Sequence, residues 1–208
     1  LVIWNGQLVA GGLNISGSGT VSTWNGSAWT PIGAQFAVGV SHLVVWNGDL
    51  VAVTRGGGSA FAIHRWNGAT WTTLPTPPSV QIVHSVVAYQ GLLCVAGSDT
   101  SQAIGWLDRW NGASWLPSIT ATGAILCLAV RPSQILGGSD MLYAGGYFQN
   151  IGGTAAQFIA ATAGGSGFAW AALGTGLPTI CLSMAVRNNG TLPGEVVACT
   201  YVAGPSGP

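Results

Sequence analysis

The tripeptide Trp-Asn-Gly recurs along this chain at a regular spacing. It begins at Trp4, Trp24, Trp46, Trp66 and Trp110, and Tyr89-Gln90-Gly91 takes a sixth equivalent place. Two interleaved series result, one through positions 4, 46 and 89 and the other through 24, 66 and 110, and each advances by 42 to 44 residues per step. The chain is therefore built from tandem units, and each unit contains two of these turns.

An Asn-Gly pair between two alternating apolar runs is a strong signal for a two-residue β-hairpin, because both turn residues must take a positive φ. Each unit then predicts four short antiparallel strands. In the second unit we expect strands over 41–46, 50–55, 61–66 and 70–74, and in the third over 84–89, 92–97, 103–110 and 114–119. The fourth unit lacks the Trp-Asn-Gly turn, and the fifth keeps only the strands 182–186 and 196–202.

Four-stranded units of this length with aromatic and glycine signatures are typical of β-propeller blades. The sequence therefore predicts an all-β fold, a single β-propeller domain over 1–208 with four complete blades and a half blade. We expect the blades at about 1–39, 40–81, 82–124, 125–179 and 180–208, the last of them incomplete.

The recurring aromatic and basic residues are interpreted as structural parts of the blades. Arg65 and Arg109 take the same place before the third-strand turn. We expect the repeated tryptophans to form the core between blades. They are Trp24, Trp29, Trp66, Trp71, Trp110 and Trp115.

Two stretches carry a family resemblance. His84–Tyr89 followed by Leu92–Gly97 resembles a kelch-type blade. Leu142–Phe148 with Gly152-Gly153-Thr154 is similar to the long propeller repeats of secreted bacterial proteins, including those of planctomycetes. The resemblance extends over essentially the whole chain and implies the fold, but propellers carry many unrelated functions, so it implies no specific activity.

The chain carries few charges, with five Lys or Arg residues, five Asp or Glu residues and a net charge of zero. Nucleic acids and anionic membranes bind clustered Lys and Arg, so we expect no nucleic-acid partner. The apolar runs, such as 124–130, are far shorter than the roughly 20 residues of a spanning helix, so we expect no membrane span.

Several features favour an extracellular or cell-surface protein. They are four cysteines, the low charge and three Asn-x-Ser/Thr sites at Asn14, Asn25 and Asn189. The chain opens at Leu1 rather than Met, and we expect it to be part of a longer polypeptide or a processed product.

A half blade leaves an unpaired strand edge, which is a template for association. We therefore expect a protein partner, or self-association, at the open blade edge.

The cysteines allow one hypothesis about cross-linking. Aligning the hairpins places Cys94 and Cys199 on one face of their blades, and Cys127 and Cys181 on the other. Neighbouring blades meet by opposite faces, so we expect at most one inter-blade disulfide, joining Cys127 to Cys94 or to Cys199. The alternative is four buried free thiols.

Local motifs for chemistry are missing from the sequence. There is no Gly-x-Ser-x-Gly elbow, His-Glu-x-x-His, Cys-x-x-Cys or phosphate-binding Gly-x-x-x-x-Gly-Lys. We therefore predict no catalytic residue, no metal site and no cofactor. A glycosidase carboxylate pair, or a copper site drawn from the dispersed His and Tyr residues, is the enzymatic alternative.

Both Asn-Gly turns of a blade lie at one end of the propeller, and the longer loops, where function concentrates, lie at the other. We expect ligand-binding residues at that long-loop end, at His42, Arg55, Gln81, His84, Asp99, Gln149 and Asn150, with Asn14, Ser16, Gln102 and Thr154 nearby. Amides, hydroxyls and few charges suit sugar hydroxyls or a peptide backbone better than phosphate. The sequence thus favours a non-enzymatic extracellular recognition or structural module within a larger protein or assembly, and the alternative is a carbohydrate-binding lectin.

Overall fold

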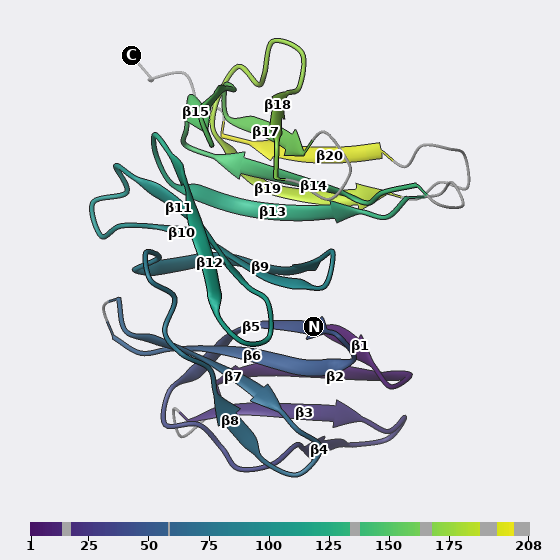
Figure 1. The fold of residues 1–208 in the computed structure, drawn as a ribbon. Helices are drawn as coiled ribbons and strands as arrows, with labels where there is room; N and C mark the ends of the chain where they lie inside the picture. Colours follow the sequence, from purple (N-terminus) through teal and green to yellow (C-terminus); the bar gives the residue numbers. More distant parts are fainter. Residues whose placement is uncertain (14–17, 58, 134–137, 163–167, 188–194, 202–208) are drawn as a thin grey trace, which may run out of the picture.

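The computed structural model describes residues 1–13, 18–57, 59–133, 138–162, 168–187 and 195–201. These residues form antiparallel sheets and no helix, and the sheets are arranged as the blades of a four-bladed β-propeller (Figure 1). The fold class expected from the repeat is confirmed. Among the described residues there is also no helix with the length and hydropathy needed to cross a bilayer.

Each blade is a meander of four strands. Blade 1 contains β1 (Val2–Trp4), β2 (Gln7–Leu13), β3 (Gly19–Trp24) and β4 (Trp29–Pro31). Blade 2 contains β5 (Gly39–Trp46), β6 (Asp49–Arg55), β7 (Phe61–Trp66) and β8 (Trp71–Thr73). Blade 3 contains β9 (Ile82–Tyr89), β10 (Leu92–Ser98), β11 (Gly105–Trp110) and β12 (Trp115–Ala121). Blade 4 contains β13 (Ile125–Arg131), β14 (Met141–Gly146), β17 (Ile159–Thr162) and β18 (Trp170–Ala172).

Two further strand pairs lie outside these four meanders. A half blade consists of β19 (Cys181–Arg187) and β20 (Glu195–Thr200). The hairpin β15 (Asn150–Ile151) and β16 (Thr154–Ala155), which belongs to the fourth sequence unit, pairs with the outer edge of blade 3 through Ala121 and Ile151. The first strand of each blade, here called its inner strand, packs beside the inner strand of the next, from β1 through β5, β9 and β13 to β19.

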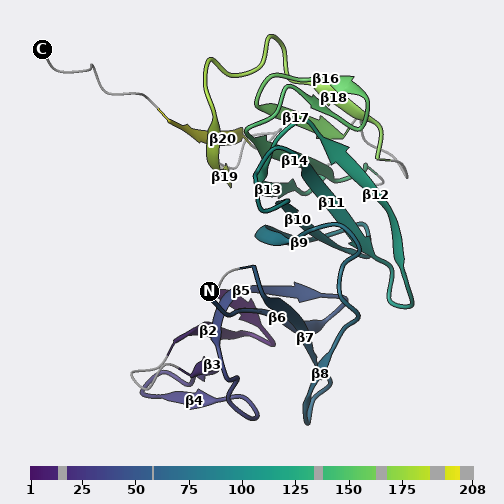
Figure 2. The same ribbon diagram turned by 90° about the vertical axis from the view of Figure 1, so that its left-hand side faces the viewer.

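The blades succeed one another in a row with two open ends. Figures 1 and 2 show β1–β4 at one end and β19–β20 at the other. The near face of a blade is defined as the face toward the preceding blade, and the far face as the face toward the next blade. The contact between two blades is called a seam.

Trp-Asn-Gly forms two different turns. In the first series both residues have a positive φ, as at Asn47 (50°) and Gly48 (85°), which is the expected two-residue hairpin. In the second series the tryptophans at the ends of a four-residue loop pair with each other, as Trp66 does with Trp71. There the Asn67 Oδ1 accepts the backbone N–H of Thr70 at 2.8 Å, so the asparagine caps the loop.

The expectation of a two-residue hairpin at every turn is therefore wrong for the second series. The glycine alone takes a positive φ there, at Gly26, Gly68 and Gly112. The spacing Trp-Asn-Gly-x-x-Trp distinguishes this loop, because the second tryptophan must lie beside the first across the sheet edge.

The core is divided among the seams. Between blades 2 and 3, far-face residues such as Val51 and Ile63 pack against near-face residues such as Leu93 and Trp110. Trp66 and Trp110 are buried, which confirms their expected place between blades. Trp29 is exposed, because none of the described blades packs on the near face of blade 1.

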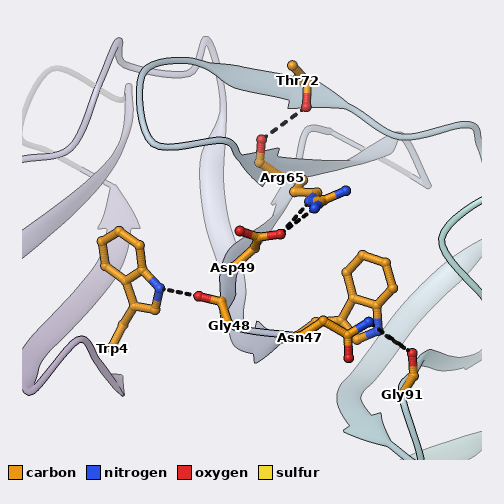
Figure 3. A network of polar contacts seen from close by, with 8 residues as sticks. Trp4, Asn47, Gly48, Asp49, Arg65, Thr72 and Gly91 are labelled. Atoms are coloured by element: carbon orange, nitrogen blue, oxygen red, sulfur yellow. Dashed lines mark hydrogen bonds and ion pairs between the residues drawn. The ribbon is translucent and has the colours of Figure 1, made fainter.

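Hydrogen bonds fasten the same seams at the turn end of the inner strands. The Trp4 Nε1–H donates to the Gly48 carbonyl at 2.8 Å (Figure 3). The Trp46 Nε1–H donates to Gly91 O at 2.8 Å. Tyr89 repeats the contact with its hydroxyl, which donates to Asp140 O at 3.2 Å. Within blade 2, Arg65 pairs with Asp49, which fits the structural role expected of that arginine (Figure 3).

The expected cysteine pairing is wrong. No disulfide joins the four cysteines in the structure, and the neighbour of Cys127 is Cys181, at an Sγ–Sγ distance of 3.7 Å. Arg131 pairs with Met141 as Trp46 pairs with Asp49, so Cys127 lies level with His42 and not with Leu43. A register error of one residue moves a side chain to the opposite face of its strand. Cys127 therefore shares the far-face orientation of Cys94 and cannot meet it across a seam.

Candidate functional site

Three of the predicted ligand-binding residues lie together, where the inner strands of blades 2 and 3 meet. His42 is on β5, His84 is on the adjacent β9, and Arg55 ends β6. We call these three residues the His–Arg patch. The Nε2 of His42 lies 3.0 Å from the carbonyl oxygen of His84. A carbonyl can only accept, so the neutral ring carries its proton on Nε2 and donates it there.

β-Bulges set the positions of these histidines. The pairing of β5 with β6 shifts between Val40 and His42, and the pairing of β9 with β10 shifts at Gly97, which leaves His84 as the extra residue. A bulge changes the direction of a side chain relative to the strand. As a result the His84 Nε2 lies 3.1 Å from the Ser98 hydroxyl rather than in the apolar seam.

Burial, together with the nearby Arg55, favours the neutral form of both histidines. Burial lowers the pKa of His42, and the nearby Arg55 lowers it further, although the hydrogen bond to His84 opposes the shift. The pKa of His84 is lowered by burial, then by Arg55 and by His42. A neutral imidazole offers one donor and one acceptor, so the patch combines neutral polar groups with one guanidinium.

Arg55 is the cationic residue of this region that could contact a ligand. It is exposed, and within the described part of the chain its guanidinium has no hydrogen-bond or ion-pair partner. Three other arginines are engaged: Arg65 pairs with Asp49, Arg187 pairs with Glu195, and Arg109 donates to the Pro117 carbonyl. The Arg55 guanidinium can therefore donate hydrogen bonds to a carbonyl, hydroxyl or carboxylate oxygen of a ligand.

Two more predicted residues lie near by but serve their own loops. The Gln81 side-chain oxygen accepts the Thr100 N–H at 3.2 Å. Asp99 accepts the Ser101 hydroxyl at 2.6 Å and the Ile104 N–H at 3.3 Å, and these hydrogen bonds, the Ser101 bond first, lower the pKa of Asp99. Both side chains order the connection between β10 and β11.

The remaining predicted residues lie elsewhere. The backbone N–H groups of Gln149 and Asn150 donate to the Thr122 hydroxyl at 3.0 Å, beside the β15–β16 hairpin. Gln149 lines a separate cavity of 410 Å³ with Gln157 and Thr175. Asn14 and Ser16 lie outside the described residues. The seven predicted residues thus do not form one site.

The sequence reasoning missed an aromatic cavity beside blade 2. The cavity has a volume of 330 Å³ and is lined by Phe36, His64 and Trp71, with Gln35 and the hydroxyls of Thr70 and Thr73. The Phe36 ring centroid lies 4.6 Å from that of His64 and 5.3 Å from that of Trp71. His64 is a polar residue in the middle of a mainly apolar third strand, which is the signal that could have drawn attention to it.

Blade 3 has a buried acidic residue, Asp108, at the position on its third strand that is equivalent to His64 in blade 2. Asp108 has no exposed surface, and its carboxylate accepts the backbone N–H groups of Ser79 at 3.1 Å and Val80 at 2.9 Å, together with the Ser118 hydroxyl. Its hydrogen-bond capacity is used to anchor the connection between blades 2 and 3. Over the described ranges no group of three or more His, Cys, Asp or Glu side chains could hold a metal ion.

Comparison with known proteins assigns the chain to no family, because no protein-family model and no curated protein matches it.

Proposed function

We propose that the chain is a non-enzymatic, kelch-type recognition or structural module, extracellular or at the cell surface, that works within a larger assembly joined through its open blade faces. The observation that carries this proposal is that apolar positions that are buried or half-buried in the internal seams are exposed at both ends of the row.

The near face of blade 1 is one of these surfaces. Ile3 is 64% exposed, whereas Val45 at the same level of β5 is half-buried. Trp29 is 45% exposed, whereas the equivalent Trp71 donates its Nε1–H to Ile32 O of the preceding connection at 2.9 Å. Ile3 and Trp29 are therefore apolar residues of the kind that pack between blades in the internal seams, but here they are uncovered.

The far face of the half blade is the other surface. Val197 is 52% exposed, whereas Val51 at the same level of β6 is fully buried. Cys199 is exposed where Val53 is buried. These residues lie on the side that, in the earlier blades, packs on the next blade.

The chemistry of the two end faces supports self-association. Every seam joins the far face of one blade to the near face of the next, so the contact that fits both ends is heterologous, between different surfaces. We propose a second copy of this chain as the partner, with its blade 1 seated on the half blade of the first. Large exposed apolar patches on soluble proteins commonly mark such contacts.

The test is the mass of the 21.0 kDa chain in solution as its concentration is raised. Sedimentation velocity is expected to show association, and Val197→Asp and Ile3→Asp are each expected to abolish it. Ile104→Asp is the matched control, because Ile104 is 43% exposed but lies in the loop before β11. A monomer at every concentration, or equal loss in the control, would contradict the proposal.

Carbohydrate binding is the second candidate function, and the aromatic cavity beside blade 2 favours it. Aromatic walls with a rim of amide and hydroxyl groups suit a sugar, which has apolar faces and polar edges. A glycan array probed with Gln35→Ala and Arg55→Ala variants separates the possible sites. Loss with Gln35→Ala places the sugar in the cavity, loss with Arg55→Ala places it on the His–Arg patch, and no binding by the parent chain contradicts the lectin function.

A further inference from the structure

Two thiols face each other across the seam between blade 4 and the half blade. The Sγ of Cys127 on β13 lies 3.7 Å from the Sγ of Cys181 on β19, and the two residues are 54 positions apart in the chain. Both side chains are buried. The sulfurs are in contact, and a small approach of the two inner strands would bring them to bonding distance.

Cys127 occupies a position on β13 that is equivalent to His42 on β5 and Ser85 on β9. At each of these positions the side chain contacts the inner strand of the next blade. His42 donates to the His84 carbonyl, and the Ser85 hydroxyl at the same level of β9 accepts the Leu128 N–H at 3.1 Å. The Cys127 Sγ lies 3.8 Å from the Cys181 carbonyl oxygen. The contact between the cysteines therefore follows from the repeated geometry of the inner strands.

A glycine provides the space for the two sulfurs. Gly145 pairs with Cys127 across the sheet, at the level where blades 2 and 3 have Val53 and Ala96. A Cβ at Gly145 would lie 2.6 Å from the Cys181 Sγ and 2.9 Å from the Cys127 Sγ. In this seam the pair of thiols takes the space that the methyl or isopropyl group fills in blades 2 and 3.

The hydrogen bond between the thiols makes them unequal. Accepting it from Cys127 lowers the pKa of Cys181, although burial opposes the shift. The pKa of Cys127 is raised by the same hydrogen bond and by burial. Cys181 is therefore the sulfur that ionises first, and a thiolate is the form that attacks a disulfide.

We propose that Cys127 and Cys181 form a disulfide that ties the half blade to blade 4. The oxidant is a small disulfide such as oxidised glutathione, encountered while the chain folds in an oxidising compartment. The Cys181 thiolate attacks one glutathione sulfur and displaces a glutathione thiolate. Cys127, as its thiolate, then attacks the Cys181 sulfur of the mixed disulfide and releases the second glutathione. Two protein thiols are oxidised, one glutathione disulfide is reduced, and the two protons pass to the two glutathiones.

The bond would act where the fold is weakest. The half blade has two strands, and a two-stranded hairpin is marginally stable by itself. Its outer surface is exposed, so it is held mainly by the seam with blade 4. A covalent link at the start of β19 keeps this seam closed whether or not the end faces associate.

The experiment is to refold the reduced full chain in a buffer of reduced and oxidised glutathione, then to alkylate it in denaturant and map the peptides without reduction. We expect two alkylated cysteines, Cys94 and Cys199, and a peptide that links Cys127 to Cys181. Four alkylated cysteines, or a link through Cys94 or Cys199, would overturn the proposal.

Two variants and a second measurement make the test specific. The double variant Cys94→Ser/Cys199→Ser keeps both proposed partners and is expected to form the same link, whereas Cys127→Ser is expected to leave every remaining thiol free. Hydrogen exchange of β19 and β20 is expected to slow on oxidation of the parent chain and to remain unchanged in Cys127→Ser. Equal protection in the oxidised and reduced parent chain would overturn the stabilising role.

Discussion

The indole of Trp46 donates its Nε1–H to the carbonyl of Gly91 at 2.8 Å, from the last residue of one inner strand to the hairpin turn of the next blade. Trp4 makes the same contact with Gly48 one blade earlier. The inner strands of blades 1, 2 and 3 thus each end in a directional bond to the following blade, in addition to the apolar packing of the seam.

Replacing Trp46 by Phe is expected to lower the free energy of unfolding by about 2 to 3 kcal/mol, because the seam hydrogen bond is lost and the smaller ring leaves part of the buried site unfilled. Urea denaturation followed by fluorescence measures the change. Trp29→Phe is the control, since Trp29 is exposed and its indole N–H has no partner among the described residues. Equal effects in both variants would argue against a role for the hydrogen bond.

Gly145→Ala is expected to destabilise the protein by about 1 to 3 kcal/mol, because the new methyl group would overlap both seam sulfurs. Gly12→Ala is the matched control, since a Cβ there meets no atom within 4 Å. Combining Gly145→Ala with Cys181→Ala should recover part of the loss, and thermal unfolding of the parent, the two single variants and the double variant gives the coupling between the two sites. Strictly additive losses would contradict the steric explanation.

Asp108→Ala is expected to cost about 2 to 3 kcal/mol, because it removes the acceptor for two buried backbone N–H groups in the connection before blade 3. Chemical denaturation measures the loss. Asp99→Ala should have a smaller effect, because Asp99 orders an exposed loop. If both variants unfold at the same denaturant concentration, Asp108 does not anchor the connection.

Stability is expected to fall as the pH drops below about 6.5. Burial lowers the pKa of His42 and of His84 below the ordinary value of 6.5, so the unfolded chain takes up protons in a range where the folded chain does not. Unfolding free energies between about pH 7.5 and about pH 5 should therefore decrease, and the decrease should be smaller in His42→Gln. An unchanged slope in that variant would show that His42 titrates alike in both states.

Periodicity predicted most of the strands. The third unit was expected at 84–89, 92–97, 103–110 and 114–119, and its strands are Ile82–Tyr89, Leu92–Ser98, Gly105–Trp110 and Trp115–Ala121. The half blade agrees to within two residues at each strand end. Alternation and turn chemistry act over a few neighbouring residues, so the sequence expresses them directly.

The candidate site was predicted in part. His42, Arg55 and His84 do lie together, because they occupy the same end of two adjacent blades. Gln149 and Asn150 do not join them, since the insertion in the fourth unit folds back as a hairpin on the edge of blade 3. An insertion breaks the repeat, and with it the basis for placing its residues.

The sequence by itself determined the four-stranded unit, the four blades with a half blade, and the aromatic residues between blades, because these depend on a pattern that returns at each repeat. Only the tertiary structure decided which side chains meet across a seam. The Asn-Gly loops differ by a side-chain cap, and the partner of Cys127 depends on one residue of register beside a β-bulge. In a sheet such a shift reverses the face of a side chain, so pairing between blades follows from the three-dimensional register and not from the spacing of residues along the chain.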